Sequence, residues 1–486
     1  MKIKLISPII TKSDYERKVM FPPLSIASLA AYLKKYGYKV EQEDLLIKVR
    51  INDSKIRYLL KAFNNFNLRF ILDYLMDKHE SDLLDAFSSE VLRNIEYKGF
   101  NLIGFSIIDK FTLLFSLVIS KKIKVHSNAK IVLGGPFINV FNKEVLSNFE
   151  FIDYLVRGEG EIPLLNLVKF LNNEKDSLRD VSGLIFKDSK KIVANDSILQ
   201  EVDHLPAPYF EEDDMKYYQN NFDLVGKKGG VILPYEMSKG CTNKCIFCGA
   251  FSKLRIKNVY KVVEELKILK NKYKTKYFYF TDNAINQSTQ FLVLFCDLLI
   301  KNKLDIEWMV LAKPQGLDKR LLNKIHKAGC RILIYGIESG SQKILNKMRK
   351  GWDVVEMSSI LKNAVEAGIL NYISLIVDYP YETKNDFTET INFVENNSEY
   401  ITNSYFDSFV LLNNSILHNY PEENGIKIIK PTRDDIYTKL RDFNDMRFNE
   451  LNGLSWDKKR DEQLNRVGFL RAKMRDLGIR VGEPSL

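Results

Sequence analysis

The feature that most constrains the fold of this chain is a series of six short apolar segments after residue 230. They are rich in β-branched and aromatic residues, as buried strands are, and read VILPYEM, KYFYFTD, IEWMVLA, RILIYGIE, YISLIVDYP and YFDSFVLL. Helical patterns such as NVYKVVEELKILKNKY separate them. Six strand–helix units in about 190 residues predict a partial (βα)6 TIM barrel, whose site lies at the carboxyl ends of its strands.

A second alternating pattern occupies roughly the first 200 residues. Its strand-like segments are KIKLISP, YKVEQED, FNLIGFSII, AKIVLGGPF and FIDYLVRGEGE, and a polar helical insertion lies between about residues 53 and 97. This order predicts a Rossmann-like parallel sheet that binds its ligand beyond the strand ends. Small residues that let a ligand approach the backbone stand at those ends: Ser106, Gly134, Gly135, Gly158 and Gly160.

The proline-containing segment HLPAPYFEED separates the two patterns and is typical of a linker. The residues after Pro421 are mostly charged and follow helical patterns. The sequence therefore predicts an α/β protein with three domains. These are a Rossmann-like domain over residues 1–200, the partial barrel over 201–420 and a mostly helical cap over 421–486.

Composition narrows the class of protein. Five cysteines in 486 residues are too few for a disulfide scaffold and indicate a reducing compartment. No apolar run approaches the ~20 residues that span a bilayer, and MKIKLISPII does not resemble a signal peptide. The net charge of +10 comes from lysines scattered along the chain, which favours a solvated surface. We expect a soluble cytoplasmic monomer that binds neither membrane nor nucleic acid.

Three of the cysteines, Cys241, Cys245 and Cys248, lie within SKGCTNKCIFCGA, directly after the first predicted barrel strand. Three thiolates can anchor three irons of a four-iron cluster and leave the fourth iron open to a chelating substrate. The alternative metal is zinc, with Cys330 or His326 as the remote fourth ligand. Without an enzymatic role, that alternative would describe a zinc-stabilised binding protein.

CTNKCIFC resembles the three-cysteine motif of the radical S-adenosylmethionine (SAM) superfamily. In that family the open iron binds the amino and carboxylate groups of SAM. An electron from a donor such as flavodoxin or ferredoxin then cleaves the sulfonium and yields a 5′-deoxyadenosyl radical. The resemblance implies that Cys241, Cys245 and Cys248 hold the [4Fe-4S] cluster and that Phe247 lies against the adenine of SAM.

Further segments resemble the SAM contacts of the family. YGIESGSQKILNKMRKG is similar to the segment after the fourth barrel strand in cobalamin-dependent members, where Glu338 and Ser339 would face SAM. FTDNAIN places Asp282 at the end of the second strand, with Asn283 where the family often has a second acid. LAKPQGLD offers Lys313 where relatives commonly carry an arginine.

VDYPYET resembles the Gly-x-Pro-Gly-Glu-Thr turn that follows the fifth strand in the family, but Asp378 and Tyr381 replace both glycines. The altered turn could place Asp378, Tyr379 or Tyr381 near the substrate. These three are the predicted catalytic residues.

The first 170 residues resemble the cobalamin-binding domain that precedes this barrel in one large subclass. The matching segments are PPLSIASLAAYLKKYGYKV, GFSII, VLGGPF and VRGEGE. The resemblance implies cobalamin contacts at Ser106, Ile107, Gly134, Gly135, Pro136, Gly158 and Glu159. The chain has no Asp-x-His-x-x-Gly motif, so we expect cobalamin without a histidine lower ligand.

Together these resemblances imply a cobalamin-dependent radical SAM methyltransferase. It would use methylcobalamin and a 5′-deoxyadenosyl radical to methylate an unactivated carbon of a peptide or a small natural product. The alternative within the superfamily is a rearrangement, ring formation or ring contraction, with or without cobalamin.

Overall fold

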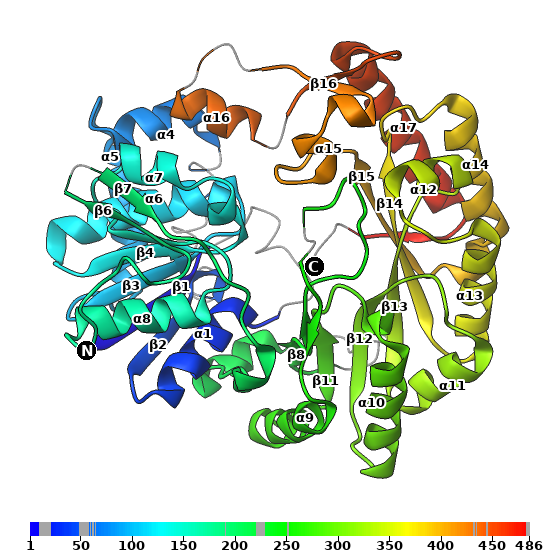
Figure 1. Ribbon diagram of the computed structural model, residues 1–486, viewed down its shortest axis with the longest axis horizontal. Helices are drawn as coiled ribbons and strands as arrows, with labels where there is room; N and C mark the ends of the chain where they lie inside the picture. Colours follow the sequence, from blue (N-terminus) through cyan, green and yellow to red (C-terminus); the bar gives the residue numbers. More distant parts are fainter. Residues whose placement is uncertain are drawn as a thin grey trace. The chain divides into compact units, whose positions relative to one another are not determined.

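The computed structural model describes residues 1–8, 21–47, 58, 60, 63, 65–189, 191–219, 229–249, 252–430, 433, 435–443 and 446–482. The chain divides into two compact units (Figure 1). The first comprises residues 1–218 and 434–441, and the second comprises residues 219–433 and 442–486. In this division the last 45 residues belong to the same unit as the barrel strands. The expected boundaries at residues 200 and 420 stay a prediction.

The first unit is built on a seven-stranded sheet in the order β2-β1-β3-β4-β5-β6-β7. The first five strands in this order are parallel, and β6 and β7 are antiparallel. This confirms the predicted Rossmann-like sheet. The strands are β1 (Lys2–Ser7), β2 (Lys39–Asp44), β3 (Leu102–Ser106), β4 (Lys130–Gly134), β5 (Tyr154–Val156), β6 (Leu184–Asp188) and β7 (Lys191–Ala194).

Helices cover both faces of this sheet (Figure 1). On one face α1 (Leu24–Lys35) packs beside α8 (Glu161–Leu171), and their apolar residues form a core with Ile3 and Leu5 of β1. The opposite face is covered by α6 (Lys110–His126), against which α4 (Leu68–Leu75) and α5 (Asp82–Arg93) pack (Figure 1). A shorter helix, α7 (Lys143–Asn148), lies between β4 and β5 in the chain.

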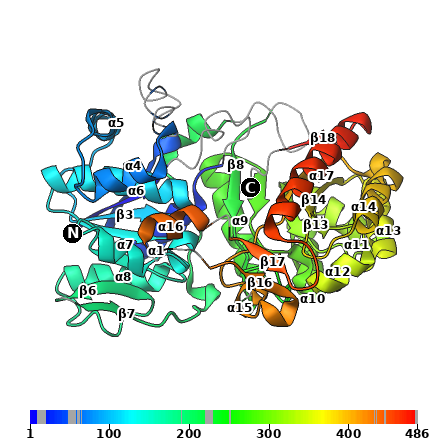
Figure 2. The same cartoon turned by 90° about the horizontal axis from the view of Figure 1, so that it is seen from above.

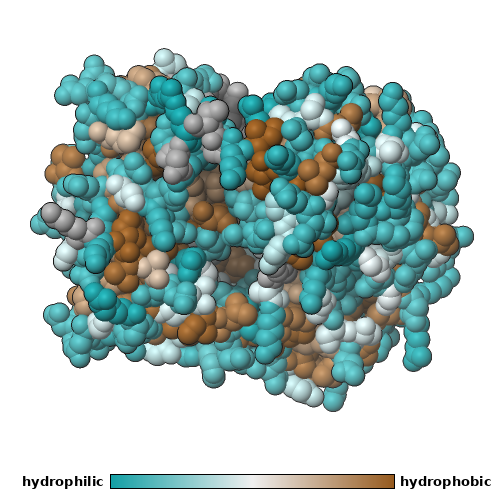
Figure 3. All heavy atoms as spheres, turned by 45° about the horizontal axis from the view of Figure 1, so that its top comes forward, coloured by the Kyte–Doolittle hydropathy of each residue, from teal (hydrophilic) through white to brown (hydrophobic). Residues whose placement is uncertain are grey.

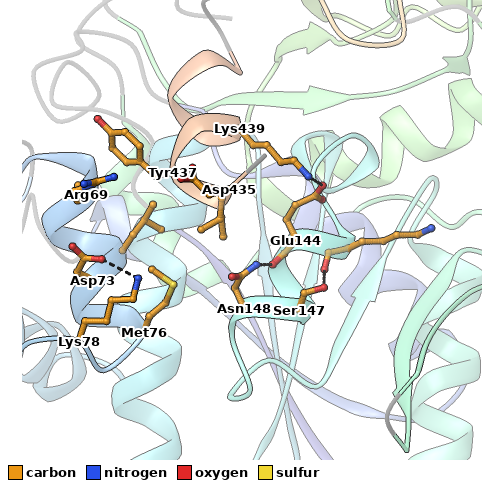
Figure 4. A pocket seen from close by; sticks show the side chains of 13 residues that line it. Arg69, Asp73, Met76, Lys78, Glu144, Ser147, Asn148, Asp435, Tyr437 and Lys439 are labelled. Carbon is orange, nitrogen blue, oxygen red and sulfur yellow. Dashed lines mark hydrogen bonds and ion pairs between the residues drawn. The ribbon is translucent and has the colours of Figure 1, made fainter. Parts of the chain in front are cut away.

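A segment from the C-terminal part of the chain completes the first unit. Helix α16 (Ile436–Asp442) begins beside α4 and α7 and frames a groove of about 750 Å³ with them (Figure 4). The Arg69 guanidinium lies 4.8 Å from the ring centroid of Tyr437, and the Lys439 ammonium lies 3.1 Å from the Glu144 carboxylate. The pattern of charged helix in the sequence did not indicate that this segment packs on the first unit.

The second unit contains a parallel sheet in the order β18-β15-β14-β13-β12-β11-β8. All six predicted barrel strands are present, and the short β18 is an addition that the sequence did not suggest. The strands are β8 (Ile232–Tyr235), β11 (Tyr277–Phe280), β12 (Glu307–Ala312), β13 (Cys330–Glu338), β14 (Leu370–Val377), β15 (Asn403–Ser408) and β18 (Arg480–Val481).

The helices between these strands follow the order of a partial barrel. They are α9 (Val259–Tyr273), α10 (Thr289–Lys301), α11 (Lys319–Lys327), α12 (Gln342–Met348), α13 (Val354–Glu366) and α14 (Lys384–Asn396). Side-chain caps begin most of them: Ser288 accepts a hydrogen bond from the Phe291 amide, and Thr383 and Asp386 form a capping box. Each connection returns the chain to the same end of the sheet, so the carboxyl ends of the strands gather at one edge.

The last part of the second unit covers two of these strands. Helix α17 (Trp456–Asp476) packs against β14 and β15 (Figure 2). Before it, α15 (Ile416–Asn419) is followed by an antiparallel pair, β16 (Ile426–Ile428) and β17 (Phe448–Glu450).

Hydrophilic side chains cover most of the face shown in Figure 3, and apolar residues appear there in small patches. Within the ranges that the structure describes, no helix has both the length and the apolar composition that a bilayer crossing requires.

Candidate active site

The three clustered cysteines lie in a loop that leaves β8 and is closed at its base by a short antiparallel pair. The pair joins β9 (Ser238–Lys239) to β10 (Arg255–Ile256). The Cys241 amide then donates to the Ser252 carbonyl over 3.1 Å. Gly240 has a φ of 91°, and a Cβ there would collide with the Lys253 carbonyl. Only glycine fits this crossing, so the backbone closes the loop immediately before the first cysteine.

The thiols of this loop act on one another. Cys245 is buried, whereas Cys241 and Cys248 are partly exposed. Burial raises the pKa of the Cys245 thiol; the Lys350 ammonium opposes this rise, and the neighbouring Cys248 and Cys241 add to it. Three thiols within mutual electrostatic reach are a suitable donor set for a cluster that needs a thiolate on each anchored iron.

The zinc alternative needs a fourth ligand besides the three clustered cysteines. The two candidates, Cys330 and His326, lie at the amino end of β13 and in α11, away from the strand ends that carry the loop. Within the described ranges, the structure shows no group of three His, Cys, Asp or Glu side chains arranged to hold a metal ion. A four-iron cluster needs only the three thiolates that the loop supplies.

Residues from the next two strands hold the cysteine loop. The Lys313 ammonium, just after β12, donates to the Thr242 hydroxyl over 2.6 Å. Burial lowers the pKa of Lys313, and the thiols of Cys241 and Cys245 act in the opposite direction. Asn283, which stands where the family often has an acid, donates to the Gly240 carbonyl over 3.0 Å. The predicted SAM ligand Lys313 therefore lies near the thiols, where its hydrogen bond to Thr242 helps to hold the cysteine loop in place.

Glu338 ends β13 in a left-handed conformation with a φ of 65°. Its carboxylate accepts a hydrogen bond from the Lys350 ammonium over 2.9 Å, and both side chains are largely buried. The same ammonium lies 5.4 Å from the ring centroid of Phe247. The structure thus brings together Glu338 and Phe247, both predicted SAM contacts, and adds Lys350. Sequence reasoning missed Lys350; its only signal is its place in the NKMRKG segment after the Glu338 motif.

Two other predicted SAM contacts, Asp282 and Ser339, form hydrogen bonds with other residues of the protein. The Asp282 carboxylate accepts from the Ser238 hydroxyl over 2.5 Å and from the Met237 amide over 3.2 Å, and burial raises the pKa of Asp282 to about 6. The Ser339 hydroxyl is fully buried, lies 3.1 Å from the Thr390 hydroxyl and accepts from the Ser341 amide. Both positions brace strand ends here, and their contact with SAM stays a prediction.

The turn after β14 has positive φ values at the two positions where the family motif carries glycine. Asp378 and Tyr381 have φ values of 65° and 66°, which is unusual for residues with side chains. The Arg466 guanidinium of α17 donates to Asp378 over 2.8 Å, and the Tyr381 hydroxyl donates to the Gly425 carbonyl over 2.5 Å. These contacts offset the backbone strain and fasten the turn to the C-terminal region. Asp378 and Tyr381 are therefore engaged within the protein, and the catalytic roles of Asp378, Tyr379 and Tyr381 stay predictions.

In the first unit, the predicted cobalamin contacts lie together at the carboxyl edge of β3, β4 and β5. The Ile107 amide donates to the Gly134 carbonyl over 2.6 Å. Gly135 has a φ of 114°, and a Cβ there would collide with the Ile107 backbone. The Ser106 hydroxyl, at the end of β3, donates to the Ser25 hydroxyl over 3.0 Å.

The end of β5 extends the same edge. The Gly158 amide donates to the Asn139 side chain over 2.7 Å, while the Glu159 carboxylate accepts from the Gln200 amide over 2.9 Å. Pro136 is exposed. Small residues and close backbone lie at this edge and would let a large flat cofactor approach; the individual contacts stay predictions.

Two family models match this chain, one over the cysteine loop and its strands and the other over the sheet of the first unit. The model of the radical SAM superfamily matches residues 235–394, which include the cysteine loop and β9 to β14. The model of the B12 binding domain matches residues 59–168, which include β3, β4 and β5.

Curated relatives include two methyltransferases and a cyclase. An uncharacterized methyltransferase, PH0819, of Pyrococcus horikoshii is 26% identical over 341 residues, which are 68% of this chain and 72% of that protein. Cytidylyl-2-hydroxyethylphosphonate methyltransferase of Streptomyces wedmorensis is 25% identical over 78% of this chain and 73% of its own length. Anaerobic magnesium-protoporphyrin IX monomethyl ester cyclase of Cereibacter sphaeroides is 30% identical over 55% of this chain, but the match spans only 44% of the cyclase.

Two solved structures share the fold over 90% of this chain. The radical SAM methyltransferase TsrM of Kitasatospora setae, with cobalamin and a [4Fe-4S] cluster bound, has a TM-score of 0.66 at 17% identity, over 84% of its own chain. The cobalamin-dependent SAM radical enzyme OxsB has a TM-score of 0.65 at 17% identity, over 63% of its own chain. A B12-binding domain and a radical SAM domain thus occur together on a shared fold, and the chain belongs to the cobalamin-dependent radical SAM enzymes, which use a [4Fe-4S] cluster, SAM and cobalamin.

Proposed function

We propose that the protein is a methyltransferase that moves a methyl group from SAM, by way of cobalamin, to an unactivated carbon of a peptide or small molecule. The observation that carries this proposal is the alignment with the phosphonate methyltransferase over 423 residues, a length that neither unit alone can accommodate. A second methyltransferase relative aligns over 341 residues. An alignment over 78% of this chain includes residues of both units, which supports chemistry that needs both cofactors.

The residues around the cysteine loop suit that chemistry. When bound, the cluster and SAM supply a 5′-deoxyadenosyl radical, and cobalamin supplies a transferable methyl group. The thiolates of Cys241, Cys245 and Cys248 would hold three irons and leave the fourth for SAM. The Lys313 ammonium is a point charge that can neutralise a carboxylate. The Glu338 carboxylate, in turn, can accept hydrogen bonds from an amino or hydroxyl group.

The proposal also includes a partner. Radical SAM enzymes need a reductant, and we propose a flavodoxin or ferredoxin as the electron donor. The net charge of +10 suits a transient encounter with an acidic electron carrier. We further propose that the protein acts as a monomer in the cytoplasm.

Methyl transfer can be tested before the substrate is known. Protein reconstituted with iron, sulfide and hydroxocobalamin is reduced with titanium citrate and given SAM that carries a trideuterated methyl group. We expect the deuterated methyl group on the recovered cobalamin and an equal amount of S-adenosylhomocysteine, both measured by mass spectrometry. Formation of 5′-deoxyadenosine with no label on cobalamin would contradict the proposal.

A second function, radical ring formation or rearrangement without methyl transfer, is supported by the 30% identity to the cyclase. The two functions differ in their by-products once a substrate is at hand. Candidates from the genomic neighbourhood can be screened with the same labelled SAM. A methyltransferase yields a product that carries the label, together with both S-adenosylhomocysteine and 5′-deoxyadenosine. A ring-forming enzyme yields 5′-deoxyadenosine and an unlabelled product.

A further inference from the structure

The turn after β14 contains a buried phenol that lacks a partner. The Tyr379 side chain is 2% exposed, and its hydroxyl is shielded from solvent. The structure gives this hydroxyl no hydrogen-bond partner among the residues it describes. A buried polar group left unsatisfied destabilises the fold, so such groups usually serve a water, an ion or a ligand. The Tyr379 hydroxyl is therefore suited to a group that the polypeptide does not itself supply.

The ring of Tyr379 packs directly on the cysteine loop. Its centroid lies 6.3 Å from that of Phe247, with the two rings nearly perpendicular, and 5.1 Å from that of Phe409. Ile246, which stands between Cys245 and Phe247, belongs to the same apolar cluster. The Ile246 amide donates to the Met348 carbonyl over 3.1 Å, and its carbonyl accepts from the Leu417 amide over 2.8 Å. The cysteine loop and the Tyr379 ring thus pack in the same hydrophobic cluster.

The backbone of Tyr379 is held as firmly as its ring. The Lys459 ammonium of α17, only 1% exposed, donates to the Tyr379 carbonyl over 3.2 Å. On the preceding residue, Arg466 holds the Asp378 carboxylate over 2.8 Å. With the ring enclosed and the backbone anchored, the hydroxyl cannot turn out to solvent without unpacking the cluster.

The electrostatic surroundings favour a donor. Burial raises the pKa of Tyr379 well above its usual value, so the phenol keeps its proton throughout the physiological range. Cys245 is also the most buried of the three clustered cysteines, which makes a donor beside it more effective than one in water.

We propose that the Tyr379 hydroxyl donates a hydrogen bond to a sulfide of the bound [4Fe-4S] cluster on the side of Cys245. Reduction adds negative charge to the cluster, and a donor to its sulfur stabilises the reduced form more than the oxidised form. Tyr379 therefore raises the reduction potential of the cluster. This inference rests on the assignment of Cys241, Cys245 and Cys248 as cluster ligands, but it does not depend on methyl transfer.

The test is Tyr379→Phe, which removes the hydroxyl and keeps the ring. Iron and sulfide content of the reconstituted variant are measured first. The midpoint potential of the cluster is then measured by reductive titration monitored by electron paramagnetic resonance, without SAM or cobalamin. We expect unchanged iron content and a midpoint potential shifted to a more negative value.

Tyr335→Phe is the matched control. Tyr335 is also fully buried with an unpaired hydroxyl within the described part of the chain, but it lies on β13, and the thiol whose charge acts on it is Cys330. The control should leave the cluster potential unchanged. A potential in Tyr379→Phe equal to that of the control would overturn the proposal. A shift that develops only when SAM is added would also overturn it, because the hydroxyl would then serve SAM.

A second variant covers the case in which Tyr379→Phe takes up less cluster. Replacement of Tyr379 by 3-fluorotyrosine keeps ring and hydroxyl but makes the phenol more acidic and hence a stronger donor. We expect a shift of the potential in the opposite direction, to a more positive value. No shift, or a negative one, would contradict the proposal. If methyl transfer is absent but both potential shifts are observed, only the proposed function fails.

Discussion

The five cysteines of this chain occupy two kinds of environment. Cys241, Cys245 and Cys248 share one loop, whereas Cys296 and Cys330 are fully buried in α10 and β13. Burial raises the pKa of the Cys296 thiol to about 12 and raises that of Cys330 as well, as expected of unreactive core thiols.

The contrast between the three loop cysteines and the two buried core cysteines predicts which substitutions remove the cluster. Changing any one of the three loop cysteines to alanine should lower the iron content after reconstitution from about four irons per chain to a small fraction, because an anchored iron loses its thiolate. Cys296→Ala and Cys330→Ala are the controls and should keep the iron content and the broad visible absorbance. Retention of the full cluster in Cys245→Ala would contradict the ligand assignment.

Asp44, at the end of β2, carries a buried carboxylate. It accepts a hydrogen bond from the Tyr218 hydroxyl over 2.6 Å. Burial raises its pKa from 3.8 to about 6; the bonds from Tyr218 and the Leu46 amide act against this rise, and Asp214 and Glu43 add to it. Because the folded pKa lies above the unfolded one, this group contributes stability below pH 4, and the contribution is lost as the pH rises through 6.

Asp44→Asn isolates this effect, since asparagine is neutral at every pH. The free energy of unfolding of the variant should rise relative to the unaltered protein by about 2 kcal/mol between pH 4 and pH 7, at about 1.4 kcal/mol per pKa unit. Urea unfolding of both proteins across this range measures the difference. A difference that does not change with pH would show that Asp44 has an ordinary pKa in the folded state.

Among the elements, α17 is joined by buried ion pairs to the turn after β14 and to β17. Arg466 pairs with Asp378 and Glu382, whose side chains are 0% and 1% exposed. Lys459 pairs with Glu450 over 3.0 Å, and these side chains are 1% and 3% exposed. Buried pairs of this kind tolerate the loss of one partner poorly.

Arg466→Met should therefore lower the free energy of unfolding by about 3–5 kcal/mol at pH 8, because it leaves buried carboxylates without a counter-charge. Burial raises the pKa of Glu382 to about 7, so the loss should be smaller at pH 6, where that carboxyl takes up a proton. Lys319→Met, which breaks the exposed pair with Glu366, is the control and should change the urea midpoint little. Equal effects of the two variants would contradict a buried role for Arg466.

The strands and most helices could be predicted because their signals are local. Apolar segments of four to nine residues separated by amphipathic helices indicate parallel strands wherever they occur in a chain. The short strands β9, β10 and β18, each of two residues, were missed, since two residues carry no periodicity. Helix α16 was predicted as a helix of the cap, but its place in the first unit depends on contacts such as Lys439 with Glu144, which sequence periodicity does not encode.

At the scale of the whole molecule, the two family matches fall in different units. The B12-binding match lies within residues 59–168 of the first unit, and the radical SAM match lies within residues 235–394 of the second. Cobalamin and the cluster should therefore be separable by substitution.

The triple variant with alanine at positions 241, 245 and 248 should lose iron yet retain the same cobalt content after gel filtration with hydroxocobalamin. Gly135→Ala should lose cobalt and retain iron. The positive φ of Gly135 and the adjacent Ile107 backbone leave no room for a Cβ at the predicted cobalamin edge. Metal analysis of both variants checks the prediction. Loss of both metals in either variant would show that the two sites depend on each other.

The sequence by itself determined the two sheets, the cysteine loop and the family, because strand periodicity and motif spacing are properties of neighbouring residues. Only the tertiary structure decided how the predicted site residues are used. Asp378 accepts a hydrogen bond from Arg466, which is 88 residues away in the sequence. Glu338 accepts one from Lys350, and Asp282 accepts one from Ser238. Among the three predicted catalytic residues, the Tyr381 hydroxyl is paired, whereas the buried Tyr379 hydroxyl and the second Asp378 carboxylate oxygen have no hydrogen-bond partner within the described residues. Partners distant in the chain are chosen by packing and burial, and these exist only once the strands have assembled.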